Sequence, residues 1–139
     1  MMRQRIGVAA AAVLTTDALA HLYWATGATW PADNARDLSL AVLNMEVPFT
    51  PRVLLPLAAV LLAGAWAMLT ADSRYGRLAT LAVAAGTLVR GVVGVGWMLG
   101  IGADTSTPFY WLNLVYTPVC LALFAASLAV RRAPVKALS

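Results

Sequence analysis

The sequence has few charged residues and a single cysteine, and each shortage excludes a class of protein. Only 12% of the 139 residues are charged, against about a quarter in soluble domains, so the composition excludes an ordinary water-soluble domain. Cys120 is the only cysteine, so no disulfide can form within the chain. The single histidine and the distant cysteine give neither the number nor the spacing of ligands in a usual metal site. We therefore expect no metal and no cofactor.

Apolar residues, by contrast, are abundant and make up 61% of the chain. Four stretches reach the roughly 20 residues that a helical membrane span requires; they are residues 6–27, 52–71, 78–101 and 108–130. The first stretch imitates a signal peptide, but the acidic Asp17 and the apolar run that continues beyond it favour an uncleaved span. The sequence therefore predicts an all-α fold in which residues 1–139 form a single four-span transmembrane domain, a membrane four-helix bundle.

The distribution of charge predicts how this bundle sits in the membrane. Ten Lys and Arg against six Asp and Glu give a formal net charge of +4, but the basic residues lie at span ends and in turns, so they do not indicate nucleic-acid binding. Arg36 and Arg52 flank one side of the predicted bundle. The other side carries Arg3, Arg5, Arg74, Arg77, Arg131, Arg132 and Lys136. The positive-inside rule then places both termini in the cytoplasm, and we expect a multi-pass membrane protein with membrane lipid around it.

The outer connection between the first two spans, residues 31–51, is long enough to hold structure of its own. Asp33 or Asn34 can cap a helix start, and a mostly apolar run follows before two prolines. This pattern predicts a short amphipathic helix on the outer face. The helix has two interpretations: it covers the bundle, or it is a lid over a chamber with Asn44 and Glu46 facing inward.

Two ionisable side chains fall near the middle of predicted spans. With a rise of roughly 1.5 Å per residue, Asp17 lies about 16 Å and Arg90 about 18 Å from the cytoplasmic edge of a hydrocarbon core about 30 Å thick. A charge at that depth is costly and is usually kept because it pairs, binds a ligand or moves protons. Two interpretations stay open: a buried ion pair that fixes helix register, and a catalytic, ligand-binding or proton-carrying role.

Helical spacing places further polar and aromatic side chains on the same faces. In each of three spans one face carries such a stripe: Asp17, His21 and Trp24; Arg90, Gly94 and Trp97; Asn113, Tyr116 and Cys120. The stripes reach similar depths in the outer half of the membrane, so the sequence predicts an outward-biased polar chamber. His21 either donates a hydrogen bond to a backbone carbonyl or to Asp17, or it takes part in proton transfer.

Two other features also have more than one interpretation. Trp24 and Trp97 belong to a group of outer aromatic residues that fits an interfacial belt or the walls of a site for a flat lipophilic ligand. In the third span, Gly94 leaves room beside Arg90. Close approach of a neighbouring helix explains most of the glycines in this span, of which Gly96 and Gly100 form a GxxxG motif; the six are Gly86, Gly91, Gly94, Gly96, Gly100 and Gly102.

Several stretches resemble a known family. These are residues 21–27 (HLYWATG) running to Trp30-Pro31, residues 107–109 (TPF) with 113–120 (NLVYTPVC), and the arginine of residues 88–91 (LVRG). They are similar to a family of small four-span bacterial integral membrane proteins that is catalogued only as a domain of unknown function. The resemblance implies the four-span fold and a location in the bacterial inner (plasma) membrane, and it supports the choice of residues, but it implies no reaction. The sequence departs from it at Asn113, where an acidic residue is expected.

The residues favour an intramembrane enzyme that performs acid–base chemistry on a lipophilic small molecule, as an isomerase or a cyclase does. Asp17 would act as the general acid or base, and His21 would tune it or relay a proton. Arg90 would hold a carboxylate, phosphate or enolate of the substrate, or set the charge of Asp17. The residues expected to bind or enclose the substrate are Trp24, Glu46, Trp97, Asn113 and Tyr116.

Two other classes of function fit the same residues. The chain could be a small proton-coupled transporter or lipid-binding module with Asp17 and His21 as its proton site. A homodimer would then be expected, because small multidrug exporters normally work as dimers. It could also be a structural subunit of a membrane complex, in which Asp17 and Arg90 only set the packing.

Overall fold

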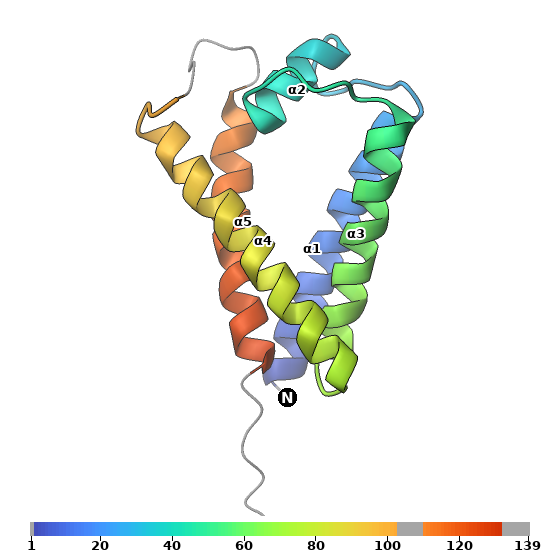
Figure 1. Cartoon of the computed structure of the whole chain (residues 1–139), viewed down its shortest axis with the longest axis vertical. Coiled ribbons are helices and arrows are strands. Elements are labelled where there is room, and N and C mark those ends of the chain that lie inside the picture. Colours follow the sequence, from blue (N-terminus) through green and yellow to red (C-terminus); the bar gives the residue numbers. More distant parts are fainter. Residues whose placement is uncertain (1, 103–109, 132–139) are drawn as a thin grey trace, which may run out of the picture.

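The computed structural model describes residues 2–102 and 110–131, and all the regular structure in them is helical. The helices are α1 (Met2–Ala25), α2 (Ala35–Leu43), α3 (Pro51–Leu69), α4 (Arg74–Met98) and α5 (Trp111–Arg131) (Figure 1). The predicted all-α fold is confirmed.

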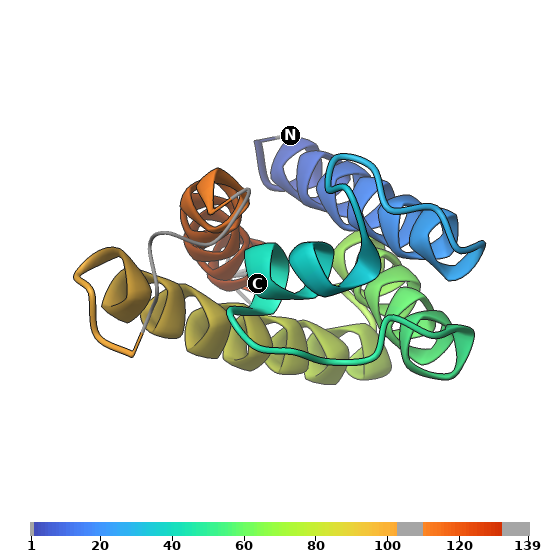
Figure 2. The ribbon, with the colours of Figure 1, turned by 90° about the horizontal axis from the view of Figure 1, so that it is seen from above.

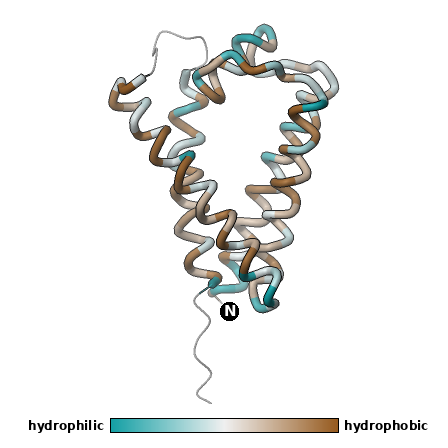
Figure 3. Tube along the Cα trace, in the orientation of Figure 1, coloured by the Kyte–Doolittle hydropathy of each residue, from teal (hydrophilic) through white to brown (hydrophobic). Residues whose placement is uncertain are grey.

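Four of these helices, α1, α3, α4 and α5, are long and apolar enough to cross a membrane. They are the four spans expected from the hydropathy of the sequence, with ends that differ by a few residues, as in a multi-pass membrane protein. The start of the fourth predicted span, residues 108–109, lies outside the described residues. So do Arg132 and Lys136 of the predicted basic side. Figure 3 shows hydrophilic residues gathered at the two ends of the bundle and apolar residues along the helices between them.

The long helices form two pairs. Helix α1 packs along α3, and α4 packs along α5, while contacts between the pairs are fewer. Figure 1 shows that the pairs meet at the end that holds the N-terminus and diverge toward α2. We call these the N-terminal end and the α2 end. Figure 2, a view from above, shows α2 lying across the space between the two pairs.

The local sequence explains how α2 begins and ends. The side chain of Asn34 accepts a hydrogen bond from the backbone N–H of Asp37 at 2.9 Å, which caps the first turn. Asn44 ends the helix in the left-handed conformation, with φ 54°. Its side-chain Nδ2 also donates to the backbone oxygen of Gly102 at 2.9 Å, which ties α2 to the chain beyond α4. The predicted helix in the outer connection is therefore confirmed, with Asn34 as its cap.

Two clusters of buried apolar side chains hold the bundle together. The cluster between α1, α3 and α5 contains Leu14, Met68, Leu123 and Val130. The cluster below α2 contains Trp24, Ala32, Leu38, Val42 and Leu54. Many large apolar side chains are instead exposed on the outer faces of the long helices, among them Leu19, Val60, Val89 and Val92. This arrangement suits helices that are surrounded by lipid rather than by water.

The glycines of α4 that pack closely are not those of the GxxxG motif. A Cβ at Gly96 or Gly100 would meet no atom of the described residues within 4 Å, so neither glycine lies at a contact between the described helices. The close approach of α4 to α5 occurs at Gly91, where a Cβ would lie 2.5 Å from Leu121, and at Gly94, which faces Thr117. Close helix approach is therefore confirmed at Gly91 and Gly94 but is not seen at the GxxxG pair among the described residues, because the face of α4 that meets α5 carries the first two glycines.

Candidate functional site

Asp17, in the middle of α1, contacts side chains from its own helix and from α5. The hydroxyl of Tyr116 donates a hydrogen bond to Asp17 Oδ1 at 3.2 Å. One turn further along α1, His21 Nδ1 lies 3.3 Å from the same oxygen and 2.8 Å from the backbone oxygen of Asp17. Because a backbone carbonyl only accepts, this geometry places the imidazole proton on Nδ1. Asp17 Oδ1 is therefore shared by a phenol and an imidazole.

His21 is enclosed by aromatic side chains on the α2 end. Its ring centroid lies 5.3 Å from that of Trp24, and Trp24 in turn lies 5.9 Å from Phe49. The indole Nε1 of Trp24 donates to the backbone oxygen of Trp30 at 2.9 Å, which fixes the orientation of the ring. The Trp24 ring is thus held against the His21 ring, and both side chains are buried.

A groove between α1 and α5 exposes Asp17 to the outside of the bundle. The groove has a volume of about 390 Å³. Its lining comes from two helix faces: Ala12, Val13, Thr16, Asp17 and Ala20 of α1, and Val115, Tyr116, Val119, Cys120 and Leu123 of α5. Val13 and Val115 on its rims are 41% and 51% exposed. A mostly apolar groove that opens sideways at the middle of two spans faces the region where lipid chains lie. His21 and Arg90 do not line it.

Arg90 contacts an amide, a carbonyl and two aromatic rings. Its Nη2 donates to Asn113 Oδ1 at 3.0 Å and to the backbone oxygen of Val42 in α2 at 3.2 Å. The guanidinium carbon lies 4.9 Å from the ring centre of Trp97 and 6.0 Å from that of Tyr116, within the range of cation–π attraction. Within the part of the chain that the structure describes, no carboxylate lies within 4.0 Å of this guanidinium.

The ion pair that the sequence offered for Asp17 and Arg90 is therefore not formed. Helix α1 packs mainly on α3, and α4 packs mainly on α5. Tyr116 stands between the two residues, with its hydroxyl on Asp17 and its ring beside Arg90. The two ionisable groups are connected through this tyrosine and do not neutralise each other directly.

Two buried donors in this region have no partner among the described residues: Arg90 Nη1 and Asn113 Nδ2. Asn113 is only 2% exposed. Gly94 lies against the guanidinium, because a Cβ at this position would be 2.6 Å from Arg90 Nη1. This confirms the expectation that Gly94 leaves room beside Arg90.

Glu46, which was expected to face the chamber, is on the surface. Its carboxylate lies 2.7 Å from Arg36 Nε, and the side chains of Glu46 and Arg36 are 61% and 67% exposed. The left-handed turn at Asn44 redirects the chain after α2, so Glu46 returns over the first turn of that helix. The expectation that Glu46 faces inward was wrong for this reason, and its role in binding substrate stays an untested prediction.

Sequence reasoning missed two contacts of the site, and only the second had a signal in the side-chain pattern. The Val42 acceptor is a backbone carbonyl, and an apolar side chain gives no signal for it. Thr117 donates its hydroxyl to the backbone oxygen of Asn113 at 2.8 Å, and a threonine four residues after an asparagine on one helix was the available signal. Among the described residues, no three His, Cys, Asp or Glu side chains gather closely enough to hold a metal ion.

In the comparison with known proteins, one family matches this chain. The profile of a family described as "Protein of unknown function (DUF3995)" matches residues 14–127, a range that includes Asp17, His21, Arg90, Asn113 and Tyr116. No curated protein and no solved structure matches the chain.

Proposed function

The chain belongs to the DUF3995 family of proteins of unknown function, and we propose that it is an intramembrane enzyme that moves a proton on a lipophilic small molecule. Asp17 is the acid–base group in this proposal. The observation that carries it is the position of the Asp17 carboxylate, which lines an apolar groove while Tyr116 and His21 contact the same oxygen.

The contacts of Asp17 support a role in proton transfer. An unpaired carboxylate at the middle of a membrane span is costly, and Tyr116 offsets part of this cost with one hydrogen bond. A general base must reach the atom from which it removes a proton. Asp17 lines the groove, so it can reach a substrate that lies there. His21 lies beside Asp17 and is itself buried under Trp24, so it can accept a proton or return one without exposing the site to bulk water.

The simplest reaction for a single acid–base group is to move a proton from one carbon of the substrate to another. Asp17 as a carboxylate removes a proton from one carbon of the substrate, and the resulting acid returns a proton to another carbon. One C–H bond breaks and one forms, so the product is an isomer and no second substrate is consumed. Tyr116 holds the carboxylate in place during both steps.

The groove supports a substrate that arrives from the lipid. Apart from Thr16, Asp17, Tyr116 and Cys120, the residues that line it are apolar. Its exposed rims lie at the middle of α1 and α5, where a soluble metabolite would have no access. Membrane lipid or a lipid-soluble molecule is therefore the proposed partner.

The proposal also includes the membrane and the orientation. Arg3, Arg74, Arg77 and Arg131 lie at the N-terminal end, whereas Arg36 and Arg52 lie at the α2 end. The positive-inside rule then supports cytoplasmic termini. We propose the bacterial inner membrane as the location, with the α2 end on the outer side.

The test compares lipid extracts from cells that produce the wild-type chain, Asp17→Asn or Asp33→Asn at equal levels. Asp33 is an exposed aspartate before α2, so Asp33→Asn makes the same chemical change away from the groove. We expect chromatography with mass spectrometry to show a compound and an isomer of equal mass. The isomer should form with wild type and Asp33→Asn and disappear with Asp17→Asn.

Other outcomes of this comparison identify other functions. A compound that moves between cells and medium in an Asp17-dependent way, with no change of structure, would show a transporter. Identical extracts from wild type and Asp17→Asn, with a loss only of thermal stability in the variant, would show that Asp17 has a structural role and would contradict the enzyme proposal.

A further inference from the structure

The Arg90 region carries a positive charge that no described side chain neutralises. Arg90 lies in the second half of α4, well inside a span. Its described polar contacts are an amide oxygen and a backbone carbonyl, with Trp97 and Tyr116 on its sides. Neutral oxygens and aromatic faces reduce the cost of a buried cation but leave its net charge in place. An anion would complete the site.

The orientation of Asn113 is fixed by Arg90, and this determines what the open position can accept. A guanidinium only donates hydrogen bonds, so the amide must present its oxygen to Arg90 Nη2, as it does at 3.0 Å. The amide nitrogen of Asn113 then points elsewhere and has no partner among the described residues, and neither has Arg90 Nη1. Both open groups are donors, so the missing partner is an acceptor.

The surroundings of these donors restrict the partner further. Asn113 is 2% exposed, so the site is dry and does not suit a large, fully hydrated polar ligand. Gly94 contributes no side chain beside Arg90 Nη1, and the adjoining rings belong to Trp97 and Tyr116. A small anionic group on an apolar body matches these surroundings. A carboxylate matches them best, because its two oxygens can accept from a guanidinium and an amide together.

We infer that Arg90 and Asn113 bind the carboxylate of a lipophilic carboxylic acid. This inference rests on the proposed function, because it names the class of substrate: a lipophilic acid whose carboxylate is held by Arg90, on the other side of Tyr116 from the groove that Asp17 lines. Tyr116 separates the two parts of the site, with its ring against the binding arginine and its hydroxyl on the acid–base residue.

The experiment measures binding of oleate and oleyl alcohol to the purified full chain in detergent micelles. The two probes share the same hydrocarbon chain and differ in the charged head. Native mass spectrometry over a range of probe concentrations gives the two affinities. Charge-assisted hydrogen bonds predict that wild type prefers oleate by on the order of 10-fold or more.

Two variants remove the carboxylate site in different ways, and a third is the matched control. Arg90→Gln deletes the cation, and Asn113→Asp supplies a resident carboxylate next to Arg90 that competes with the ligand. The second variant satisfies the arginine, so it should fold even where the first does not. Arg52→Gln makes the same change as the first at an exposed position on α3. We expect the preference for oleate to vanish in the first two variants and to remain in the third.

Three results would overturn the inference. They are equal affinity of wild type for the two probes, a preference that survives in folded Asn113→Asp, and a preference that Arg52→Gln also loses. The first would mean that buried water satisfies Arg90 and Asn113. These results differ from failure of the proposed function, in which Asp17→Asn leaves the cellular compounds unchanged while Arg90 still binds oleate.

Discussion

Tyr116 Oη lies 3.2 Å from Asp17 Oδ1, and this hydrogen bond joins α5 to α1 across a groove that opens to the outside of the bundle. It is the polar contact that connects the two helix pairs at mid-span. The same tyrosine ring lies 6.0 Å from the Arg90 guanidinium carbon. Tyr116 therefore contacts both the proposed acid–base residue, Asp17, and the proposed anion-binding residue, Arg90.

Tyr116→Phe tests the first of these roles. The ring remains beside Arg90, but Asp17 loses its phenolic donor. A hydrogen bond to a charged group contributes roughly 1.5–3 kcal/mol, so we expect a fall in the free energy of unfolding of that order and a slower appearance of the isomer. Thermal unfolding in detergent and the lipid-extract comparison measure the two effects. Tyr75→Phe, at an exposed tyrosine of α4, is the control, and equal behaviour of the two variants would contradict the role of Tyr116.

Gly94→Ala tests the close packing beside Arg90. The added methyl would lie 2.6 Å from Arg90 Nη1 and would also meet Thr117. Overpacking of this kind typically costs about 1–3 kcal/mol. Gly96→Ala is a matched control two positions along the same helix, where a Cβ meets nothing within 4 Å. We expect it to be neutral or to stabilise by up to ~1 kcal/mol. Denaturant unfolding of both variants gives the comparison, and a Gly94→Ala variant as stable as Gly96→Ala would contradict the packing described here.

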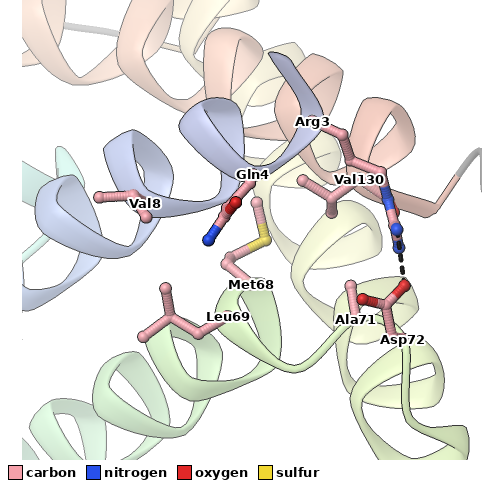
Figure 4. A pocket seen from close by; sticks show the side chains of 8 residues that line it. All are labelled: Arg3, Gln4, Val8, Met68, Leu69, Ala71, Asp72 and Val130. Carbon is pink, nitrogen blue, oxygen red and sulfur yellow. Dashed lines mark hydrogen bonds and ion pairs between the residues drawn. The ribbon is translucent and has the colours of Figure 1, made fainter. Parts of the chain in front are cut away.

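Substitutions of Arg3 and Asp72 test the contacts at the N-terminal end of the bundle. A pocket of about 480 Å³ lies there, between α1 and the end of α3. Figure 4 shows Arg3 reaching Asp72 across this pocket, at 2.6 Å. Arg3 Nε also donates to the backbone oxygen of Val130 at 2.5 Å.

Because Asp72 is exposed, Asp72→Asn should change the free energy of unfolding by less than ~1 kcal/mol. Arg3→Ala should lower the free energy of unfolding by about 1 kcal/mol more than Asp72→Asn does, because it also leaves the carbonyl of Val130 without this donor. Denaturant titration of the two variants, with Arg5→Ala as an exposed control, measures the difference. Equal losses for Arg3→Ala and Asp72→Asn would show that the contact with Val130 contributes nothing.

Labelling of single cysteines tests which end of the bundle faces the cytoplasm. In a Cys120→Ser background, Asp33→Cys places a thiol before α2 and Tyr75→Cys places one in the first turn of α4, both at exposed positions. With the termini in the cytoplasm, a membrane-impermeant maleimide should label D33C in intact cells after removal of any outer membrane. It should label Y75C only after the inner membrane is opened. The reverse pattern would invert the proposed topology.

The fold could be predicted because each helix carries its own signal. The spans follow from apolar runs near the length that a bilayer demands, and α2 follows from the cap at Asn34 and the prolines after it. Glu46 was misplaced because an asparagine permits but does not require the left-handed turn that redirects the chain at Asn44.

The members of the candidate site could be chosen from the sequence, but their pairing could not. Helical spacing correctly placed His21 beside Asp17 and Trp97 beside Arg90, since these contacts lie within one helix or its end. Equal depth suggested that Asp17 and Arg90 meet. Depth fixes only one coordinate, however, and the choice of neighbouring helix and the rotation of each helix decide which groups touch.

The hydrogen bond from Arg90 to the carbonyl of Val42 has a consequence for how the outer connection can vary. Every residue offers the same backbone oxygen, so substitutions at position 42 that keep the helix preserve this acceptor. Adding or deleting one residue within α2 would instead turn the carbonyl by about 100°, since a helix has 3.6 residues per turn. Surface connections normally tolerate changes of length better than the elements they join. Here the guanidinium of a distant span restricts the number of residues in α2, whereas the side chain at position 42 is restricted separately by its place in the buried cluster below α2.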